Sequence, residues 1–243
     1  MFWALKKKLK LLIDIIYPRY CIVCQKNLKV DSLAELICSE CWVKIKRNIP
    51  PTCRYCGKHI NSSVLDGICE TCKKRDYYFD RVYAACNYDG ILKELIHQFK
   101  YSGKEYLGFI LSRLLIEFIN KSGLSLECFD FVIPVPLHKR KKREREFNQS
   151  YILAKNVAEQ FKLVLLKEGL LRIRDTRTQT ELPKQKRFKN VKDCFLVNPR
   201  VELKGKNILL IDDLLTTGAT CSEAAYALKQ AGCQQVWVLT LAN

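Results

Sequence analysis

The chain has 243 residues, 48% of them hydrophobic and 28% charged, and it carries a formal net charge of +17. Its length suits one medium-sized domain plus a small one, and its composition is that of a globular protein. No stretch of about 18 uninterrupted apolar residues is present, which excludes a membrane-spanning helix. The excess of positive charge favours a polyanionic partner, namely nucleic acid, an anionic membrane or a phosphate-rich ligand, although a lysine-rich proteome would produce the same excess.

Residues 1–18 are predicted to form a separate N-terminal segment with an amphipathic helix at 2–16. Its apolar side chains recur at spacings of three and four, which places them on one helical face: Phe2, Leu5, Leu9, Leu12 and Ile16. Four lysines between residues 6 and 10 make the helix basic, so it can make peripheral contact with the inner face of an anionic membrane. Packing on the protein's own domains is the simpler interpretation. The lysines also interrupt the apolar run, so the segment does not resemble a signal peptide, and we expect a cytoplasmic protein in which disulfides are disfavoured.

Residues 19–76 contain eight of the thirteen cysteines in two similar patterns. The spacing is C-x2-C-x13-C-x2-C and then C-x2-C-x12-C-x2-C: Cys21, Cys24, Cys38, Cys41, Cys53, Cys56, Cys69 and Cys72. Each close pair fits a knuckle that presents two thiolates to one metal, and two knuckles complete a tetrahedral site typical of zinc. We therefore predict a double zinc ribbon with two structural Zn2+ sites, rather than a disulfide cluster or a redox pair. Pairing in sequence order is the first expectation, and a cross-braced arrangement stays open.

Residues 77–243 alternate between strand and helix patterns. The predicted strands and helices, in chain order, are strand 81–88, helix 91–99, helix 107–119, strand 129–135, helix 149–161, strand 163–173, strand 208–211, a helix ending at Ala231 and strand 236–241. Such alternation predicts an α/β domain with a mostly parallel sheet and helices on both faces. The remaining cysteines are scattered through this domain and are expected to be core residues: Cys86, Cys128, Cys194, Cys221 and Cys233.

Two basic loops are predicted to flank a ligand site. The first, residues 138–149, follows a strand end, where ligands of open α/β sheets bind. The second spans residues 172–192. Lys100, outside these loops, is a further candidate for anion binding. The full set of candidates is Lys100, Arg140, Arg143, Arg145, Asn148, Gln149 and Arg187. Two solvated surface loops are the plain alternative.

Residues 208–220 combine a buried strand, two acids and a turn of small and hydroxyl residues. The non-alternating apolar run predicts a strand covered on both faces, and Asp212 and Asp213 are predicted to end it. Residues 216–220 can turn backbone N–H groups toward an anion at a helix N-terminus, and Gly218 allows close approach of the backbone. Carboxylates accept hydrogen bonds from vicinal hydroxyls. The stretch therefore predicts a ligand that carries both a ribose and a phosphate.

This stretch resembles the binding motif of the phosphoribosyltransferases, whose pattern is hydrophobic-acid-acid-x-x-Thr-Thr-Gly-x-Thr. The resemblance implies a type I phosphoribosyltransferase-like fold that binds phosphoribosyl pyrophosphate with Mg2+. Asp212 and Asp213 would hold the ribose hydroxyls and act in catalysis if transfer occurs. The phosphoribosyl-binding residues would be Asp212, Asp213, Leu214, Leu215, Thr216, Thr217, Gly218, Ala219 and Thr220. Basic groups would stabilise the leaving pyrophosphate, with Lys100, Arg140, Arg143 and Arg145 as candidates.

The order of motifs along nearly the whole chain is similar to that of the ComF family of competence proteins. Cysteine knuckles come first, then Val-Pro-Leu-His with an arginine-rich loop ending in Phe-Asn-Gln, then Thr-Gln…Leu…Arg…Asn-Val, and then the phosphoribosyl motif. The family pattern has glycine before Phe-Asn-Gln, where this chain has Glu146. The resemblance implies handling of incoming single-stranded DNA during natural transformation, together with a DNA-translocating helicase at the membrane.

Three functions follow from these patterns. The first is a competence protein that binds phosphoribosyl pyrophosphate and single-stranded DNA. The second is a phosphoribosyltransferase that acts on a base or another acceptor. The third is an interaction scaffold at the membrane that uses the zinc ribbon and the N-terminal helix.

Overall fold

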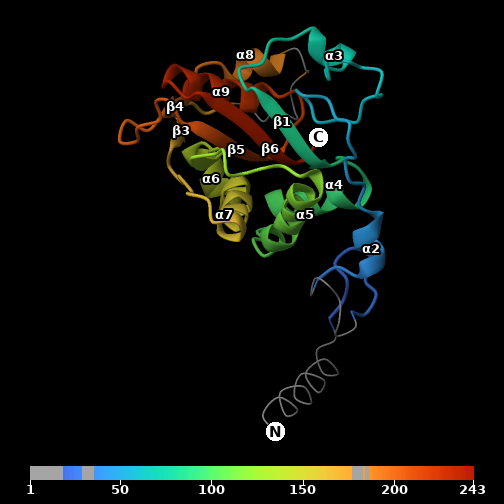
Figure 1. Cartoon of the computed structure of the whole chain (residues 1–243). Coiled ribbons are helices and arrows are strands. Elements are labelled where there is room, and N and C mark those ends of the chain that lie inside the picture. The colour runs from blue at the N-terminus through green and yellow to red at the C-terminus, as the bar shows by residue number, and fades with distance from the viewer. Residues whose placement is uncertain (1–18, 29–35, 177–182, 184–185) are drawn as a thin grey trace. The chain divides into compact units, whose positions relative to one another are not determined.

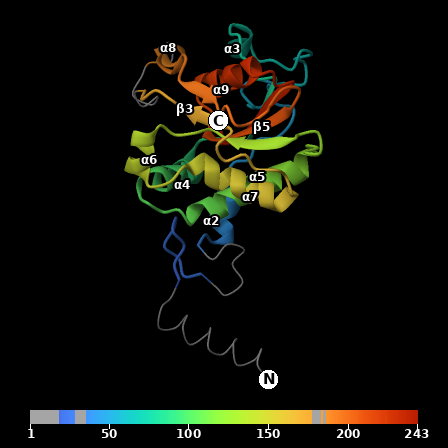
Figure 2. The same ribbon diagram turned by 90° about the vertical axis from the view of Figure 1, so that its left-hand side faces the viewer.

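A computed structural model of the chain describes residues 19–28, 36–176, 183 and 186–243 (Figures 1 and 2). Two compact units make up the chain, residues 1–46 and residues 47–243. The helix predicted at residues 2–16 lies outside the described residues. None of the described helices is long and apolar enough to cross a membrane.

A four-stranded parallel sheet lies at the centre of the unit formed by residues 47–243. Its strands are ordered β1 (Arg81–Cys86), β6 (Gln235–Ala242), β5 (Asn207–Leu214) and β2 (Phe131–Pro134). A separate antiparallel pair joins β3 (Leu170–Arg172) to β4 (Phe195–Val197). The two middle strands are buried on both faces, as their continuous apolar runs predict.

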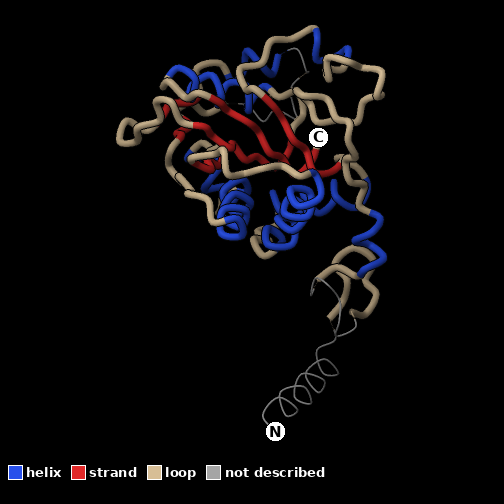
Figure 3. The backbone as a smooth tube through the Cα atoms, in the orientation of Figure 1, coloured by secondary structure: helices blue, strands red, loops and turns tan. Residues whose placement is uncertain are grey.

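Helices cover both faces of this sheet, which gives the unit three layers (Figures 1 and 3). One face carries α5 (Leu107–Ser122) and α7 (Gln149–Phe161), with α4 (Gly90–Tyr101) beside α5. The other face carries α9 (Ala219–Gln230), next to which lie α8 (Arg187–Val191) and β4. In α5 the buried side chains recur every three or four residues, because only one stripe of a surface helix can face the sheet.

The described part of the chain contains three further short helices: α2 (Ser39–Lys44), α3 (Glu70–Lys73) and α6 (Lys139–Arg145). The predicted α/β class with a parallel, doubly covered sheet is confirmed. The predicted helix at 149–161 coincides with α7. Most other elements lie within three residues of the predicted bounds at each end, as is usual where helices and strands fray.

Four sequence predictions were wrong in detail. The apolar stretch 163–173 forms strand only at β3 and one parallel bridge, from Leu165 to Val132. The two basic segments predicted as loops contain helices α6 and α8. The acid pair lies within β5, because the strand keeps pairing with β6 as far as Leu214. Cys128 is exposed, whereas the other four scattered cysteines are buried.

Helix α6 forms because its long basic side chains are good helix formers and because it is capped. The Nδ1 atom of His138 accepts a hydrogen bond from the Arg140 N–H at 3.4 Å, and Arg140 pairs with Glu144 one turn later at 3.1 Å. The helix ends at Glu146, whose φ is 67°. That region favours glycine, the residue that the ComF pattern has at this position. The chain therefore keeps the glycine-like turn although it carries a side chain there.

Candidate functional site

The eight knuckle cysteines form two separate clusters of four. Within each cluster the sulfur atoms all lie within 4.8 Å of one another, and the grouping follows sequence order: Cys21, Cys24, Cys38 and Cys41, then Cys53, Cys56, Cys69 and Cys72. The ligands are therefore not cross-braced. Four sulfurs held 2.3 Å from a zinc ion would lie about 3.8 Å apart. The Cys24–Cys38 and Cys56–Cys69 sulfur distances of 3.6 and 3.8 Å fit this geometry.

Backbone N–H groups support the thiolates of both clusters. The amide of Cys38 donates to the Cys21 sulfur at 3.4 Å, and the amide of Cys69 donates to the Cys53 sulfur at 3.3 Å. Because four thiols leave no open coordination position, these are structural Zn2+ sites rather than catalytic ones. The first cluster belongs to residues 1–46 and the second to residues 47–243.

The second cluster packs directly on the central sheet. The amide of Val82 in β1 donates to the Arg54 carbonyl at 2.8 Å, and the side-chain amide of Asn243 donates to the Cys56 carbonyl at 2.7 Å. A Cβ atom added to Gly57 would come within 2.9 Å of the Ala84 side chain. The knuckle and β1 are thus in close contact, and the knuckle is a part of the domain that carries the sheet.

The acid pair lies near the carboxyl end of β5, where the two side chains point to opposite faces of the strand. Asp213 is 6% exposed and forms an ion pair with the Lys100 ammonium at 2.8 Å. Asp212 accepts hydrogen bonds from the Ser150 hydroxyl at 2.8 Å and from the Asp213 amide at 2.9 Å. The buried Cys221 thiol donates to its second oxygen at 3.6 Å. Each of these three partners of Asp212 is a neutral donor.

This environment makes Asp212 a weaker acid than usual. Burial and the neighbouring Asp213 charge raise the pKa of Asp212 to about 6, against the opposing influence of Lys100 and Ser150. The two carboxylates are therefore held together at a cost, since like charges and burial both disfavour the ionised form. Perturbed pKa values cluster at functional sites, which makes the acid pair a candidate for one.

The turn from Leu215 to Gly218 connects the acid pair to α9. Gly218 has a φ of 77° and is the residue before the first turn of the helix. The Ala219 amide is 3.5 Å from the Thr217 hydroxyl. Thr216 is exposed, whereas Thr217, Gly218 and Ala219 are buried. The N-terminus of α9, with the positive end of the helix dipole, therefore lies next to this turn. We call residues 215–220 the phosphate loop, after the role that the sequence motif predicts for them.

A cleft of about 110 Å3 lies over the acid pair and the phosphate loop. The residues that line it, apart from the acid pair, include Lys100, Tyr101, Pro136, Leu137, Lys141, Arg145, Gln149, Ser150, Arg172, Leu214, Thr216 and Thr220. Of the predicted anion-binding residues, the structure brings Lys100, Arg145 and Gln149 to this cleft. It does not place Arg140, Arg143, Asn148 or Arg187 in the lining.

Several predicted anion-binding side chains hold the protein backbone instead. The side-chain oxygen of Asn148 accepts a hydrogen bond from the Ser150 backbone N–H at 3.1 Å, which caps α7. The side-chain NH2 group of Asn148 donates to the Val135 backbone carbonyl at 3.1 Å. Gln149 is 1% exposed, donates to the Phe99 carbonyl at 3.3 Å and accepts from Arg145 at 3.2 Å. Both residues thus fix the walls of the cleft, which is a positioning task.

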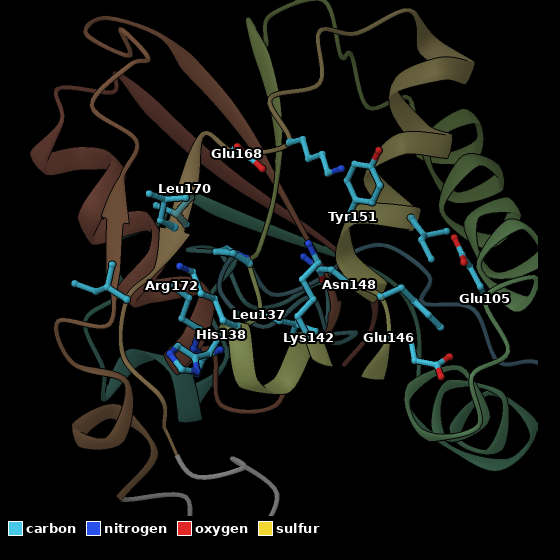
Figure 4. Close-up of a pocket in the computed structure, with 17 residues that line it drawn as sticks. Glu105, Leu137, His138, Lys142, Glu146, Asn148, Tyr151, Glu168, Leu170 and Arg172 are labelled. Carbon is cyan, nitrogen blue, oxygen red and sulfur yellow. The ribbon is translucent and has the colours of Figure 1, made fainter. Parts of the chain in front are cut away.

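A larger pocket of about 620 Å3 adjoins the cleft and shares Pro136, Leu137 and Arg172 with it. Figure 4 shows its labelled residues around one hollow; they come from α6, α7, β3 and the segments next to them, except Glu105, which lies between α4 and α5. The lining combines apolar side chains with cations and acids, among them Lys142, Tyr151 and Glu168. The Lys167 ammonium lies 4.7 Å from the centre of the Tyr151 ring.

Sequence reasoning missed three contributors to this site. Ser150 and Cys221 contact Asp212 from α7 and α9, and only the folded chain brings them to β5. Arg172 was assigned to a basic loop, but it lies in β3 and lines both the cleft and the pocket. Its Nε atom is buried without a hydrogen-bond partner in the described part of the chain. An unpartnered buried donor beside a polar cleft is a signal that only the structure could supply.

The fold and this site define a protein class. A parallel sheet with an acid pair near the end of a central strand, followed by a phosphate loop, is the arrangement of a phosphoribosyltransferase domain. The family model for the phosphoribosyl transferase domain matches residues 148–243, and that for the double zinc ribbon domain matches residues 12–75.

Whole-chain relatives narrow this class to one family. DNA utilization protein YhgH of Escherichia coli K12 is 32% identical, over 91% of this chain and 96% of its own length. Competence protein F of Haemophilus influenzae is 28% identical, over 92% of this chain and 96% of its own length. Competence protein ComFC of Bacillus subtilis is 25% identical, over 89% of this chain and 91% of its own length. The chain belongs to the ComF family.

The burial of Asp212 predicts that Asp212→Asn stabilises the ligand-free protein in a pH-dependent way. Because the folded pKa is raised from 3.8 to about 6, the contribution of Asp212 to folding is present below pH 4 and is lost as the pH rises through 6. The variant avoids this loss. We expect it to gain about 1–3 kcal/mol in unfolding free energy at pH 8, and little at pH 4.5. Urea unfolding at several pH values measures the difference.

Asp130→Asn is the matched control for this measurement. Hydrogen bonds from the Asn207 amide and Lys206 lower the pKa of Asp130. Its favourable contribution is therefore present above pH 4 and lost as the pH falls, so the substitution should reduce stability at neutral pH. An Asp212→Asn protein that is no more stable than wild type at pH 8 would contradict the burial argument.

Proposed function

We propose that this protein binds phosphoribosyl pyrophosphate and handles single-stranded DNA during DNA uptake. The observation that carries the proposal is the acid pair beside the phosphate loop, under a cleft lined by Lys100, Lys141 and Arg145. Acids alone would suit a cation and a basic cleft alone would suit any phosphate. Their combination fits a molecule that has vicinal hydroxyls between two groups of phosphate.

The chain supplies a partner for each part of this ligand. The phosphate loop would bind the 5′-phosphate through backbone N–H groups and threonine hydroxyls. Asp212 and Asp213 would accept hydrogen bonds from the ribose hydroxyls. The basic side chains at the other wall of the cleft, Lys141 and Arg145, would face the pyrophosphate. Mg2+ would arrive with the ligand and neutralise part of its charge.

Lys100 has a specific place in this proposal. In the ligand-free protein its ammonium offsets the charge of Asp213 at 2.8 Å. Once hydroxyl groups and a cation approach the acid pair, this ammonium is free to turn toward the pyrophosphate without leaving the acids uncompensated. Lys100 would thus exchange one anionic partner for another, which fits its position at 15% side-chain exposure on the rim of the cleft.

The DNA-handling part of the proposal draws on charge, on the adjoining pocket and on the relatives. Helix α6 has the sequence KRKKRER and buries none of its residues. The 620 Å3 pocket that opens beside it is of a size that holds one nucleotide unit. The net charge of +17 favours a polyanion. Relatives over more than nine-tenths of the chain are named a competence protein and a DNA utilization protein.

The proposed place of action is the cytoplasmic side of the cell membrane, where a DNA-translocating helicase would deliver the strand. The basic amphipathic pattern of residues 2–16 motivates this part of the proposal. Flotation with anionic liposomes compares the full chain with a version that lacks residues 1–18. We expect only the full chain to float, and equal flotation of both would refute a membrane contact at this segment.

The double variant Asp212→Ala with Asp213→Ala should lose measurable binding of phosphoribosyl pyrophosphate. The hydroxyl acceptors are gone, whereas the sheet keeps its apolar core, so the fold is expected to survive. Calorimetry with Mg2+ and phosphoribosyl pyrophosphate measures the affinity, and circular dichroism verifies the fold. Asp130→Ala, which removes an acid outside the cleft, serves as the control. Unchanged affinity in the double variant would defeat the assignment of the site.

Binding of single-stranded DNA should weaken steeply with salt. Each phosphate contact contributes about −0.7 to the slope of log affinity against log salt, so four contacts on α6 give about −3. Lys142→Ala, in α6 at the pocket, should weaken binding and flatten this slope by about 0.7. Lys155→Ala is the matched control, because Lys155 pairs with Glu159 on α7 and lines neither cleft nor pocket. A flat salt response in filter binding would contradict the DNA-handling function.

A further inference from the structure

Tyr77 lies between the second cysteine cluster and the phosphate loop. Its hydroxyl oxygen is 3.9 Å from the Cys72 sulfur on one side and 3.5 Å from the Thr217 carbonyl oxygen on the other. One side chain therefore contacts both a metal-binding cysteine and the backbone that is proposed to bind the 5′-phosphate. Neither the zinc sites nor the acid pair by themselves explain this arrangement.

The ring of Tyr77 forms the floor of the phosphate loop. A Cβ atom added to Gly218 would come within 2.9 Å of the Tyr77 ring edge, so the loop backbone rests directly on the ring. The ring also stacks on Tyr55 and on Phe79, with centroid distances of 5.3 and 5.0 Å, and the Tyr55 and Phe79 rings lie 6.2 Å from each other. Because Tyr55 lies between Cys53 and Cys56 in the knuckle, the aromatic cluster of Tyr55, Tyr77 and Phe79 connects the second cysteine cluster to the loop.

The chain connection strengthens this link. Tyr77 follows Cys72 by five residues, and the next residue, Tyr78, donates its backbone N–H to the Ser222 hydroxyl in the first turn of α9 at 3.2 Å. The segment that leaves the knuckle is therefore attached to the same helix N-terminus that the phosphate loop enters. A displacement of Cys72 would be transmitted to both.

Packing carries more of this coupling than hydrogen bonding. Distances of 3.5 and 3.9 Å are at or beyond the long end of hydrogen-bond geometry, so the hydroxyl contributes weakly. The ring, by contrast, packs on the rings of Tyr55 and Phe79, and its edge lies against the backbone of Gly218. Loss of the ring should therefore matter, and loss of the hydroxyl alone should matter little.

We propose that Tyr77 is a positioning residue through which metal bound at Cys53, Cys56, Cys69 and Cys72 holds the phosphate loop in its anion-binding shape. Metal at this cluster and phosphoribosyl pyrophosphate then bind cooperatively, a consequence that rests on the function proposed above. The two cysteine clusters thus have different tasks. The second sets the shape of the ligand site, and we assign no such task to the first, in residues 1–46.

Hydrogen exchange of the amides in residues 214–222 tests the first half of the proposal without any ligand. The matched pair is Cys56→Ser and Cys24→Ser, in which each full-length variant loses one metal site and keeps the other. We expect exchange of the loop to rise about tenfold in Cys56→Ser and to stay at the wild-type rate in Cys24→Ser. Equal exchange in the two variants would overturn the proposal.

Tyr77→Ala separates the coupling from the integrity of the knuckle. This variant should keep two zinc ions per chain and yet show the faster loop exchange, whereas Tyr77→Phe should behave like wild type. Tyr78→Ala is the control, because the Tyr78 side chain is 52% exposed and packs on Tyr226, and the substitution keeps the backbone N–H that bonds to Ser222. Wild-type exchange in a zinc-loaded Tyr77→Ala protein would show that the ring does not hold the loop.

Competition for zinc with a colorimetric chelator tests whether metal at the second cluster and phosphoribosyl pyrophosphate bind cooperatively. In wild type, phosphoribosyl pyrophosphate should raise the equilibrium zinc affinity of the second cluster about tenfold in competition with the chelator, and metal loss should weaken ligand binding by the same factor, because linkage of binding equilibria is reciprocal. Both factors should fall to about one in Tyr77→Ala. Absence of any ligand binding in zinc-loaded wild type would refute the proposed function, while the exchange experiment would still decide the role of Tyr77. Coupling that persists in Tyr77→Ala would refute that role alone.

Discussion

The constraint on which the rest of the structure depends is the placement of two adjacent carboxylates near the end of a buried central strand. Burial and mutual repulsion oppose the ionised forms, and they raise the pKa of Asp212 to about 6. The surrounding elements are arranged to offset this cost. Lys100 comes from the end of α4, Ser150 from the first turn of α7 and Cys221 from the first turn of α9. Both helical layers thus converge on one point of the sheet.

The second zinc ribbon extends this convergence to the far side of the phosphate loop. Small domains of this size bury too little apolar surface to be stable without a metal. Here the knuckle also gains a surface to pack on, through β1 and the C-terminal Asn243. In return it provides Tyr55 and the start of the segment that carries Tyr77. A structural metal site and the proposed ligand site therefore share one aromatic cluster, in which Tyr77 contacts Cys72 through its hydroxyl and Gly218 through its ring.

The basic segments show how tertiary contacts divide residues that look alike in sequence. Asn148 and Gln149 follow an arginine run and look like ligand-binding residues, yet they satisfy the backbone of Val135 and Phe99. Arg145 reaches the cleft from the same run, whereas Arg140 pairs with Glu144 and Asp175 on the outside of α6. Glu146 keeps a φ of 67°, so the turn between α6 and α7 survives the replacement of the glycine in the family pattern.

The sequence by itself determined those features that depend on local spacing. Paired cysteines two residues apart specify knuckles, continuous apolar runs specify buried parallel strands, and the acid pair followed by Thr-Thr-Gly specifies a turn at a helix N-terminus. Only the tertiary structure decided which side chains face each other across elements. Ser150, Cys221 and Tyr77 are separated from their partners in the site by 9 to 140 residues. Their roles depend on sheet order and helix packing, and these arise from burial of the whole apolar surface rather than from any local pattern.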